Sequence, residues 1–255
     1  MTFRATDQTT TDAHHVRALV IGVGGLGCPA ALALARAGVG TLGLVDPDVV
    51  DVSNLPRQLL YDAADVGRPK VTVAAERLRA VAPALRVVTR QARFTASDAG
   101  WLRDFDVVLD GTDSIAAKFD VSDAAVAAGV PLVHAGAIDF RAQLLTIVPR
   151  ETACYRCVFE DAPPPDDVPS CQEAGVLGPV VALAGSLQAA EALRVAVGAP
   201  PHFADRLLSI DLRDGTWRSI RVARRRGCAA CTNEVRAPDR TPEPGLQVSQ
   251  GRNES

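Results

Sequence analysis

A glycine-rich segment, residues 22–27, follows the apolar run 18–21 and precedes a helical pattern. In a turn from strand to helix, the first glycine permits the tight bend and the second lets the backbone approach a phosphate. The third lets the helix pack close to the sheet, and N–H groups at the helix start attract anions. Asp46 ends the next apolar run, at about the 20-residue spacing where a carboxylate binds ribose hydroxyls. The segment therefore predicts a nucleotide site, with a purely structural turn as the alternative.

Cationic and amide side chains follow Asp46 closely. A nicotinamide cofactor would be the default ligand of a glycine turn, but Asn54, Arg57 and Gln58 come next in the chain, and Lys70 follows. Guanidinium and ammonium groups converging on the strand ends suit a triphosphate. Arg57 and Lys70 could each be a solvated surface charge. Taken together beside the glycine turn, they favour a nucleoside triphosphate.

A further carboxylate, Asp113, lies just past the apolar run 106–110. Ligands of doubly wound sheets bind in the crevice at the carboxyl ends of the strands. Asp113 could hold Mg²⁺ together with phosphate oxygens, because Mg²⁺ commonly uses one or two carboxylates and several waters. The structural alternative is that Asp113 caps the helix expected from about Ser114.

Four of the six cysteines form two Cys-x-x-Cys pairs. Four thiolates make a closed tetrahedral zinc site, which is structural rather than catalytic. A redox pair is the alternative, but we do not expect the cysteines at a helix N-terminus, where such pairs act. Cys28 is expected to be a small core residue. The zinc ligands predicted are Cys154, Cys157, Cys228 and Cys231.

Strand and helix patterns alternate along the first part of the chain, which implies parallel strands and a doubly wound α/β sheet. Here we expect strands at 18–21, 41–46, 86–90, 106–110 and 132–134, and helices at 25–37, 69–82, 98–103 and 114–128. The later part predicts a strand at 141–148, a long apolar helix at 177–197, and a hairpin of 207–212 with 216–222. The fold expected is a Rossmann-like doubly wound sheet that is parallel at first and continues into antiparallel strands.

Composition limits the function further. The net charge is −3, and the basic residues are scattered, so we expect no nucleic-acid partner. We see no secretory signal, and the apolar helix at 177–197 contains Glu191 and Arg194, which favours a buried helix over a membrane span. A cytoplasmic location follows. We expect a flexible N-terminus at 1–14, one domain at 15–235 and a disordered tail at 236–255.

The order of these motifs resembles the ubiquitin-activating-enzyme-like adenylyltransferases, most closely the bacterial MoeB/ThiF/HesA group. The resemblance runs from about residue 17 to 232. It is carried by Gly22-x-Gly-Gly-Leu-Gly27, Asp46, Ser53-Asn-Leu-x-Arg-Gln58, Gly67-Arg-Pro-Lys70, Asp110-Gly-Thr-Asp113, the two cysteine pairs, Glu173-Ala-Gly-Val-x-Gly-Pro179 and Gly185-Ser-x-Gln188.

The resemblance implies ATP-dependent activation of the C-terminal carboxylate of a small ubiquitin-like sulfur-carrier protein ending in Gly-Gly. It implies ATP, Mg²⁺ and Zn²⁺ as cofactors and a homodimer as the assembly. The catalytic residues implied are Arg57, Lys70 and Asp113, with Cys171 as a further candidate. The nucleotide-binding residues implied are Gly25, Asp46, Ser53, Asn54, Arg57, Gln58, Lys70, Asp113 and Ser114.

The chain departs from the family pattern in several places. The family often carries an N-terminal arginine motif that reaches the partner subunit's ATP site, and residues 1–17 lack it. Ser114 stands where the family has Asn. No rhodanese-like domain follows, so we expect the sulfur donor to be a separate protein. Cys171 could form a covalent link to the carrier, as in ThiF-like proteins, or be a bystander. A non-catalytic nucleotide-binding protein and an NAD-dependent oxidoreductase remain the alternative functions.

Overall fold

A mixed sheet of eight strands, in the order β3-β2-β1-β4-β5-β6-β7-β8, forms the centre of the computed structural model. The structure describes residues 13–162 and 175–232. Strands β1 to β5 pair in parallel, and β6, β7 and β8 continue the sheet in antiparallel fashion. The expected fold class, a doubly wound sheet that turns antiparallel, is therefore confirmed. The strands are β1 (Arg17–Ile21), β2 (Thr41–Val45), β3 (Arg86–Arg90), β4 (Val107–Asp110), β5 (Leu132–Ile138), β6 (Arg141–Ile147), β7 (Arg206–Asp211) and β8 (Thr216–Arg221).

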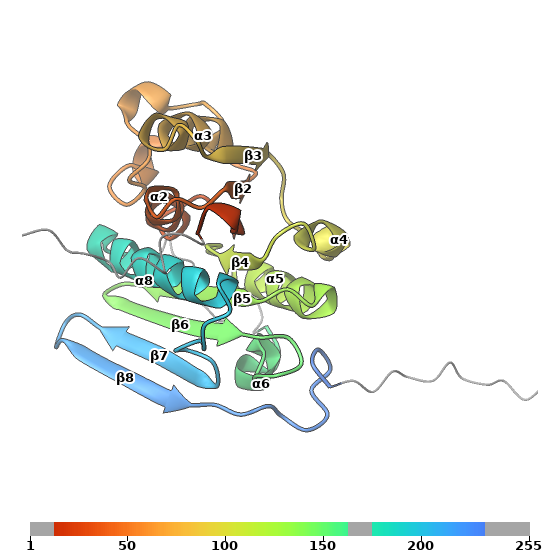
Figure 1. The fold of residues 1–255 in the computed structure, drawn as a ribbon. Helices are drawn as coiled ribbons and strands as arrows, with labels where there is room; N and C mark the ends of the chain where they lie inside the picture. The colour runs from red at the N-terminus through yellow and green to blue at the C-terminus, as the bar shows by residue number, and fades with distance from the viewer. Residues whose placement is uncertain (1–12, 163–174, 233–255) are drawn as a thin grey trace, which may run out of the picture.

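Helices cover both faces of the sheet (Figure 1). One face packs against α2, α3 and α8 through one apolar cluster, and the other packs against α4, α5 and α6 through a second. The central strands β1 and β4 are buried along almost their whole length, as expected for strands with helices on both sides. The helices are α2 (Gly27–Arg36), α3 (Lys70–Val81), α4 (Ala99–Leu102), α5 (Ile115–Ala128), α6 (Tyr155–Phe159) and α8 (Gly178–Ala196).

Local sequence accounts for the helix boundaries. Ser114 caps the start of α5 through its side chain, and Gly129 ends that helix at φ 75°, a backbone conformation that glycine adopts without strain. Pro179 lies in the first turn of α8, where its missing N–H costs nothing. None of the helices that the structure describes is long and apolar enough to cross a membrane, and α8 packs against α2 and the sheet.

The expected strand at 132–134 is too short. The structure extends β5 to Ile138, because the strand pairs with β6 from Leu132 to Ile138. The small residues after His134 lack the branched or aromatic side chains that mark a strand. The pairing partner, and not local propensity, therefore sets the length of β5.

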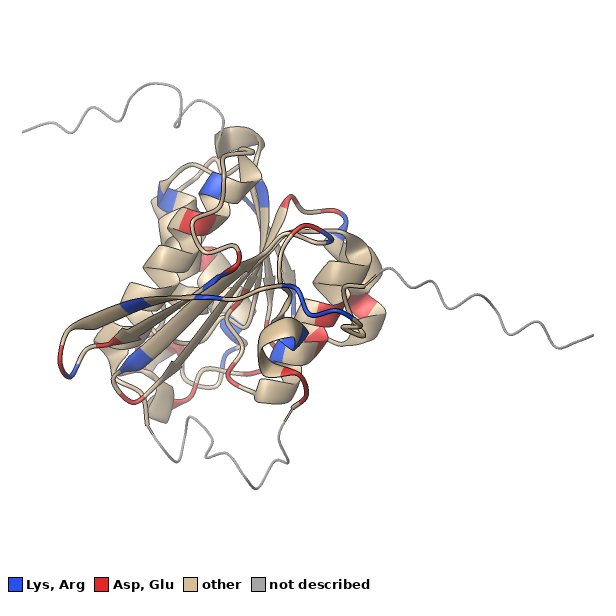
Figure 2. Cartoon of the chain, turned by 90° about the horizontal axis from the view of Figure 1, so that it is seen from below, with Lys and Arg blue, Asp and Glu red and all other residues tan. Residues whose placement is uncertain are grey.

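Acidic and basic residues are interspersed over the ribbon in Figure 2.

The 3₁₀ helix η1 (Ala13–His15) precedes β1, so the part of the expected flexible N-terminus that the structure describes is helical. The rest of that expectation, and the expected disordered tail, fall outside the described residues.

Candidate functional site

A cavity of about 360 Å³ lies at the carboxyl ends of the parallel strands. That volume falls within the usual range of small-molecule sites. The strand order brings the turns after β1, β2, β3 and β4 to the same edge. The lining includes Gly24, Gly25, Asp46, Asp48, Asn54, Arg57, Gln58, Lys70, Arg93, Phe94, Thr112, Asp113, Ser114 and Lys118.

The glycine turn forms one wall of this cavity. Gly22 has φ 86°, and a Cβ atom there would lie 2.7 Å from the backbone of Gly111. A Cβ atom on Gly27 would lie 2.0 Å from the Gly22 carbonyl oxygen. The turn from β1 into α2 thus needs glycine at both positions, and it leaves the backbone of Gly24 and Gly25 against the cavity.

Asp46 connects the end of β2 to that turn. Its side chain is 5% exposed, and its oxygens accept hydrogen bonds from Val23 N at 2.7 Å and Asp48 N at 2.9 Å. Burial raises the pKa of this carboxyl, while the positive charge of Lys70 and the two amides oppose the rise. Asp46 therefore has a rigid position on the cavity wall, as a ribose-binding carboxylate needs.

The predicted cations line the same cavity. Lys70 begins α3 and is 5% exposed, and its Nζ lies 2.8 Å from Asp48 Oδ2. Arg57 is half-buried and donates to Asn54 Oδ1 at 2.5 Å and to Ser53 O at 3.1 Å. The alternative of a solvated surface charge does not fit the burial of Lys70, whereas Arg57 is partly exposed.

Gln58 and Ser53 differ in their relation to the cavity. Gln58 is 3% exposed, and its Oε1 has no hydrogen-bond partner among the described residues. A buried polar atom without a partner at a cavity points to a ligand or water. Ser53 is exposed and donates to Asp51 instead, and it does not line the cavity.

Asp113 lies exposed on the wall formed by the turn after β4. The hydroxyl oxygen of Ser114, and not Asp113, caps α5 by accepting from Ala117 N at 3.3 Å. The capping alternative for Asp113 is therefore wrong. One exposed carboxylate at a cavity that is also lined by cations fits Mg²⁺, which takes most of its other ligands from water and phosphate.

The turn after β3 contributes residues that sequence reasoning missed. Ala92, Arg93 and Phe94 line the cavity next to Asp46, and Lys118 borders it from α5. A signal for the β3 turn was present, because the end of every parallel strand in such a sheet reaches the same crevice.

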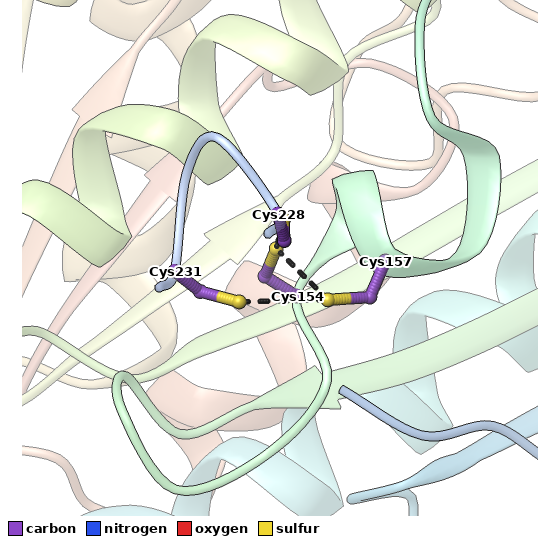
Figure 3. Close-up of side chains that lie close together, drawn as sticks. All are labelled: Cys154, Cys157, Cys228 and Cys231. Carbon is purple, nitrogen blue, oxygen red and sulfur yellow. Dashed lines mark hydrogen bonds between the residues drawn. The ribbon is translucent and has the colours of Figure 1, made fainter. Parts of the chain in front are cut away.

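A second site lies where α6 meets the chain after β8. The four predicted cysteines converge there (Figure 3), with all Sγ atoms within 4.8 Å of one another. The Sγ separations are 3.7 Å for Cys154 to Cys157, 3.6 Å for Cys154 to Cys228, and 3.4 Å for Cys157 to Cys231. A tetrahedron with Zn–S bonds of about 2.3 Å has sulfur separations near 3.8 Å, whereas a disulfide requires about 2.05 Å. The cluster could therefore hold a metal ion.

The surroundings of the cluster suit thiolate ligands. Arg225 N donates to Cys157 Sγ at 3.3 Å, and Arg224 donates to the carbonyl oxygen of Cys231 at 2.7 Å. Burial raises the pKa of Cys154. Burial also acts to raise the pKa of Cys228, but backbone amides nearby outweigh it and lower that pKa to about 7.

One expectation about these cysteines is wrong. Cys154 is the N-cap of α6, although we expected no helix start at this pair. The helix spans only Tyr155–Phe159, and contacts of the Tyr155 ring with Phe119 and His134 hold it in place. Such a short, contact-dependent helix leaves no periodic pattern in the sequence.

The remaining cysteines have different positions. Cys28 is fully buried in the apolar cluster around α2, as expected, and burial raises its pKa to about 12. Cys171, the candidate for a covalent link, lies outside the described residues.

Known proteins resemble this chain in sequence over most of its length. A model of the ThiF family matches residues 3–231. The "Adenylyltransferase and sulfurtransferase MOCS3" of Bos taurus is 48% identical over 215 residues, covering 84% of this chain and 47% of the relative. The "Sulfur carrier protein adenylyltransferase" of Thermus thermophilus is 43% identical over 222 residues, covering 85% of this chain and 82% of the relative.

Among solved structures, E. coli MccB with ATP superposes with a TM-score of 0.77 at 22% identity, covering 88% of this chain and 69% of MccB. That likeness concerns the fold alone. The chain spans about half the length of the MOCS3 relatives and most of the length of the Thermus protein.

Proposed function

The chain belongs to the ThiF family, and on this premise we propose that it is an ATP-dependent adenylyltransferase. Its substrate is the C-terminal carboxylate of a small ubiquitin-like sulfur-carrier protein. A carboxylate oxygen of the carrier attacks the α-phosphorus of ATP, and the bond from that phosphorus to the oxygen bridging the β-phosphorus breaks. Pyrophosphate leaves, and the acyl-adenylate formed is activated for sulfur transfer.

The convergence of Arg57 and Lys70 on the cavity that also holds Asp46 and Asp113 is the observation that carries this proposal. A carboxylate is already a nucleophile at neutral pH, so the reaction requires no general base. The difficulty is that one anion must approach another. Cations that line the same cavity as the glycine turn reduce that repulsion and stabilise the charge of the transition state.

Different residues around the cavity would bind different parts of the nucleotide. We assign adenosine and ribose to Gly25 and Asp46, the phosphates to Asn54, Arg57 and Lys70, and a further polar contact to the unpaired Oε1 of Gln58. Ser114 lies beside Asp113 in the lining. Mg²⁺ held by Asp113 would supply positive charge to the phosphate oxygens.

The cysteine cluster is proposed to bind zinc in a structural role. Its four ligands leave no open coordination position, and it joins α6 to the chain after β8, away from the residues of the cavity. The tie would stabilise the antiparallel end of the sheet and take no part in the reaction.

The names of the relatives favour sulfur-transfer pathways. We propose that the carrier serves molybdopterin synthesis, thiamin synthesis or tRNA thiolation, that a separate protein donates sulfur, and that the enzyme is a cytoplasmic homodimer. Cys171 is retained as the candidate for a covalent link to the carrier.

Carrier-dependent exchange between ATP and radiolabelled pyrophosphate tests the proposal. The full chain, Mg²⁺ and a small ubiquitin-like protein ending in Gly-Gly should give exchange, and the same carrier lacking its last two glycines should give none. Absence of exchange with every such carrier, combined with tight ATP binding, would favour the non-catalytic alternative. Binding of NAD in preference to ATP would favour the oxidoreductase.

A further inference from the structure

A buried polar cluster lies directly beneath the turn that carries Asp113. Asp110 ends β4, Lys118 lies in α5, and His134 lies in β5. Asp110 and His134 are 0% exposed and Lys118 is 7% exposed. Charges buried to this extent are costly unless they are paired and hydrogen-bonded, so the contacts within the cluster indicate what it does.

Lys118 uses its whole ammonium group inside the protein. Its Nζ donates to the carbonyl oxygen of Thr112 at 2.6 Å and to that of Ala135 at 2.8 Å, and lies 3.4 Å from Asp110 Oδ2. An ammonium group has no further donor to offer. Lys118 borders the nucleotide cavity, but its N–H groups are already engaged with the turn and with β5.

Asp110 holds the same turn from the other side. Its Oδ1 accepts from Thr112 N at 3.0 Å and from Thr112 Oγ1 at 2.6 Å, and its Oδ2 contacts His134 Nδ1 at 2.7 Å. Together with Lys118, it therefore engages the amide, the hydroxyl and the carbonyl of Thr112. Asp113 is the next residue in the chain.

The rest of the turn is tied down as well. Gly111 N donates to Ile21 O at 2.8 Å. Gln188 of α8 donates to Asp110 O at 2.8 Å and to Val133 O at 2.7 Å. The turn is thereby joined to β1, β5 and α8, the elements that surround the cavity.

We propose that Lys118 is a positioning residue, which with Asp110 clamps Thr112 and so holds the Asp113 carboxylate where it can take Mg²⁺. This inference rests on the proposed function. Residues that orient a metal ligand without touching the metal commonly change metal affinity or activity by about 10- to 100-fold when replaced. The clamp acts through hydrogen bonds to the turn, and not through contact with the nucleotide.

The test compares Lys118→Met, Lys118→Arg and the double variant Asp110→Asn/Lys118→Met. The double variant removes both buried charges, so that neither is left alone if Lys118→Met folds poorly. We expect the Mg²⁺ concentration for half-maximal exchange to rise about 10- to 100-fold in Lys118→Met and in the double variant. Lys118→Arg keeps the charge and should recover part of that loss. Hydrogen–deuterium exchange of residues 111–117, measured without nucleotide, should become faster.

Glu191→Gln provides the matched control. Glu191 is buried in α8 and accepts from Thr146 Oγ1 at 2.9 Å and from His202 N at 2.6 Å, so replacing it also disturbs a buried polar group. In this variant, the Mg²⁺ concentration for half-maximal pyrophosphate exchange and the hydrogen–deuterium exchange of residues 111–117 should both match the unaltered protein.

Two outcomes would overturn the positioning role. One is that Lys118→Met matches the unaltered protein both in its Mg²⁺ requirement and in the hydrogen–deuterium exchange rate of residues 111–117. The other is an equal loss of ATP affinity with and without Mg²⁺, which would make Lys118 a direct phosphate ligand. If the unaltered protein shows no pyrophosphate exchange, the proposed function fails, and hydrogen–deuterium exchange still tests the clamp.

Discussion

At the scale of single residues, position at the cavity separates the side chains that can bind a nucleotide from Ser53, which does not line it. Lys70 is buried and contacts Asp48, whereas Ser53 is exposed and donates a hydrogen bond to Asp51. Ser114 performs the helix capping that could have explained Asp113. Arg57, Lys70 and Asp113 all line the cavity.

Lys70→Met should weaken ATP binding about 10- to 100-fold, because a charge-assisted contact contributes about 1.5–3 kcal/mol. Stability should also fall, because Asp48 remains solvated without the lysine but the buried Asp46 loses the positive charge that offsets its burial. Isothermal titration with ATP measures the change. Arg79→Met, farther along the same helix, is the control and should bind ATP normally. Equal affinities for the two variants would remove Lys70 from the phosphate site.

Asp113→Asn should abolish most of the Mg²⁺-dependent exchange while preserving ATP binding in the absence of the metal. The amide keeps the shape of the side chain but lacks the charge that Mg²⁺ prefers. Exchange kinetics over a Mg²⁺ titration provide the measurement. Persistence of full activity in this variant would show that the metal is held elsewhere.

At the scale of elements, contacts rather than local propensity decide the details near both sites. β5 reaches Ile138 because β6 pairs with it along the whole length. α6 exists because Tyr155 packs against Phe119 and His134. The cysteine cluster lies at the start of this short helix, so a metal bound there would couple its binding to the folding of α6.

Removal of metal from the cysteine cluster should lower the melting temperature before it affects nucleotide affinity. The ligands join α6 to residues 228–231, and none of them lines the cavity. Thermal unfolding and ATP titration, each with and without a chelator, measure the two effects. Metal analysis should find about one zinc per chain.

Cys28→Ala is the control for that experiment. It removes a buried thiol that belongs to the core around α2, and the metal content should be retained. In Cys228→Ser the metal should be lost. Unaltered metal content in Cys228→Ser, or protein purified without any zinc, would contradict the assignment.

At the scale of the whole molecule, the sheet order brings residues distant in the sequence to one edge. The turns after β1, β2, β3 and β4 all meet at the cavity. Next to that edge, the buried cluster of Asp110, Lys118 and His134 joins β4, α5 and β5. Folding stability therefore depends on the ionisation of this cluster.

Stability should fall as the pH is lowered from about 7 to 5.5. Burial lowers the pKa of His134, and repulsion from Lys118 adds to this effect, while the hydrogen bond to Asp110 opposes it. In the unfolded chain, a histidine titrates near pH 6.5. The stability that depends on neutral His134 is fully present above about pH 6.5, and it is lost as the pH falls toward the pKa of His134 in the folded protein. Each unit of difference corresponds to about 1.4 kcal/mol.

Urea unfolding at both pH values measures this dependence. His134→Gln should reduce the difference in stability between the two pH values, and an unchanged difference would exclude His134 as its source.

Below about pH 4 the protein should lose further stability through protonation of Asp110. Burial acts to raise the pKa of Asp110, but Lys118 and His134 outweigh it and hold that pKa below its usual range, so its contribution disappears as the carboxylate is protonated.

Much of the fold could be predicted from local patterns. β3 has the expected bounds, and most other strands and helices begin or end within about two residues of expectation, which is the usual uncertainty of element boundaries. The exceptions, β5 and α6, depend on contacts with distant residues. In the site, Asp46 and Lys70 were found through motifs, whereas Arg93 and Lys118 lie in no recognised spacing and reach the cavity only through the strand order.

The sequence by itself determined the alternation of strands and helices, the glycine turn, and the residue types that suit a triphosphate and a four-cysteine metal site. These follow from local steric and chemical requirements that short stretches of chain express directly. Only the tertiary structure decided that the cysteine pairs meet, that Ser53 stays outside the cavity, and that Lys118 and Asp110 clamp the turn before Asp113. Those facts depend on which distant segments pack together, and packing follows from the burial of the whole core.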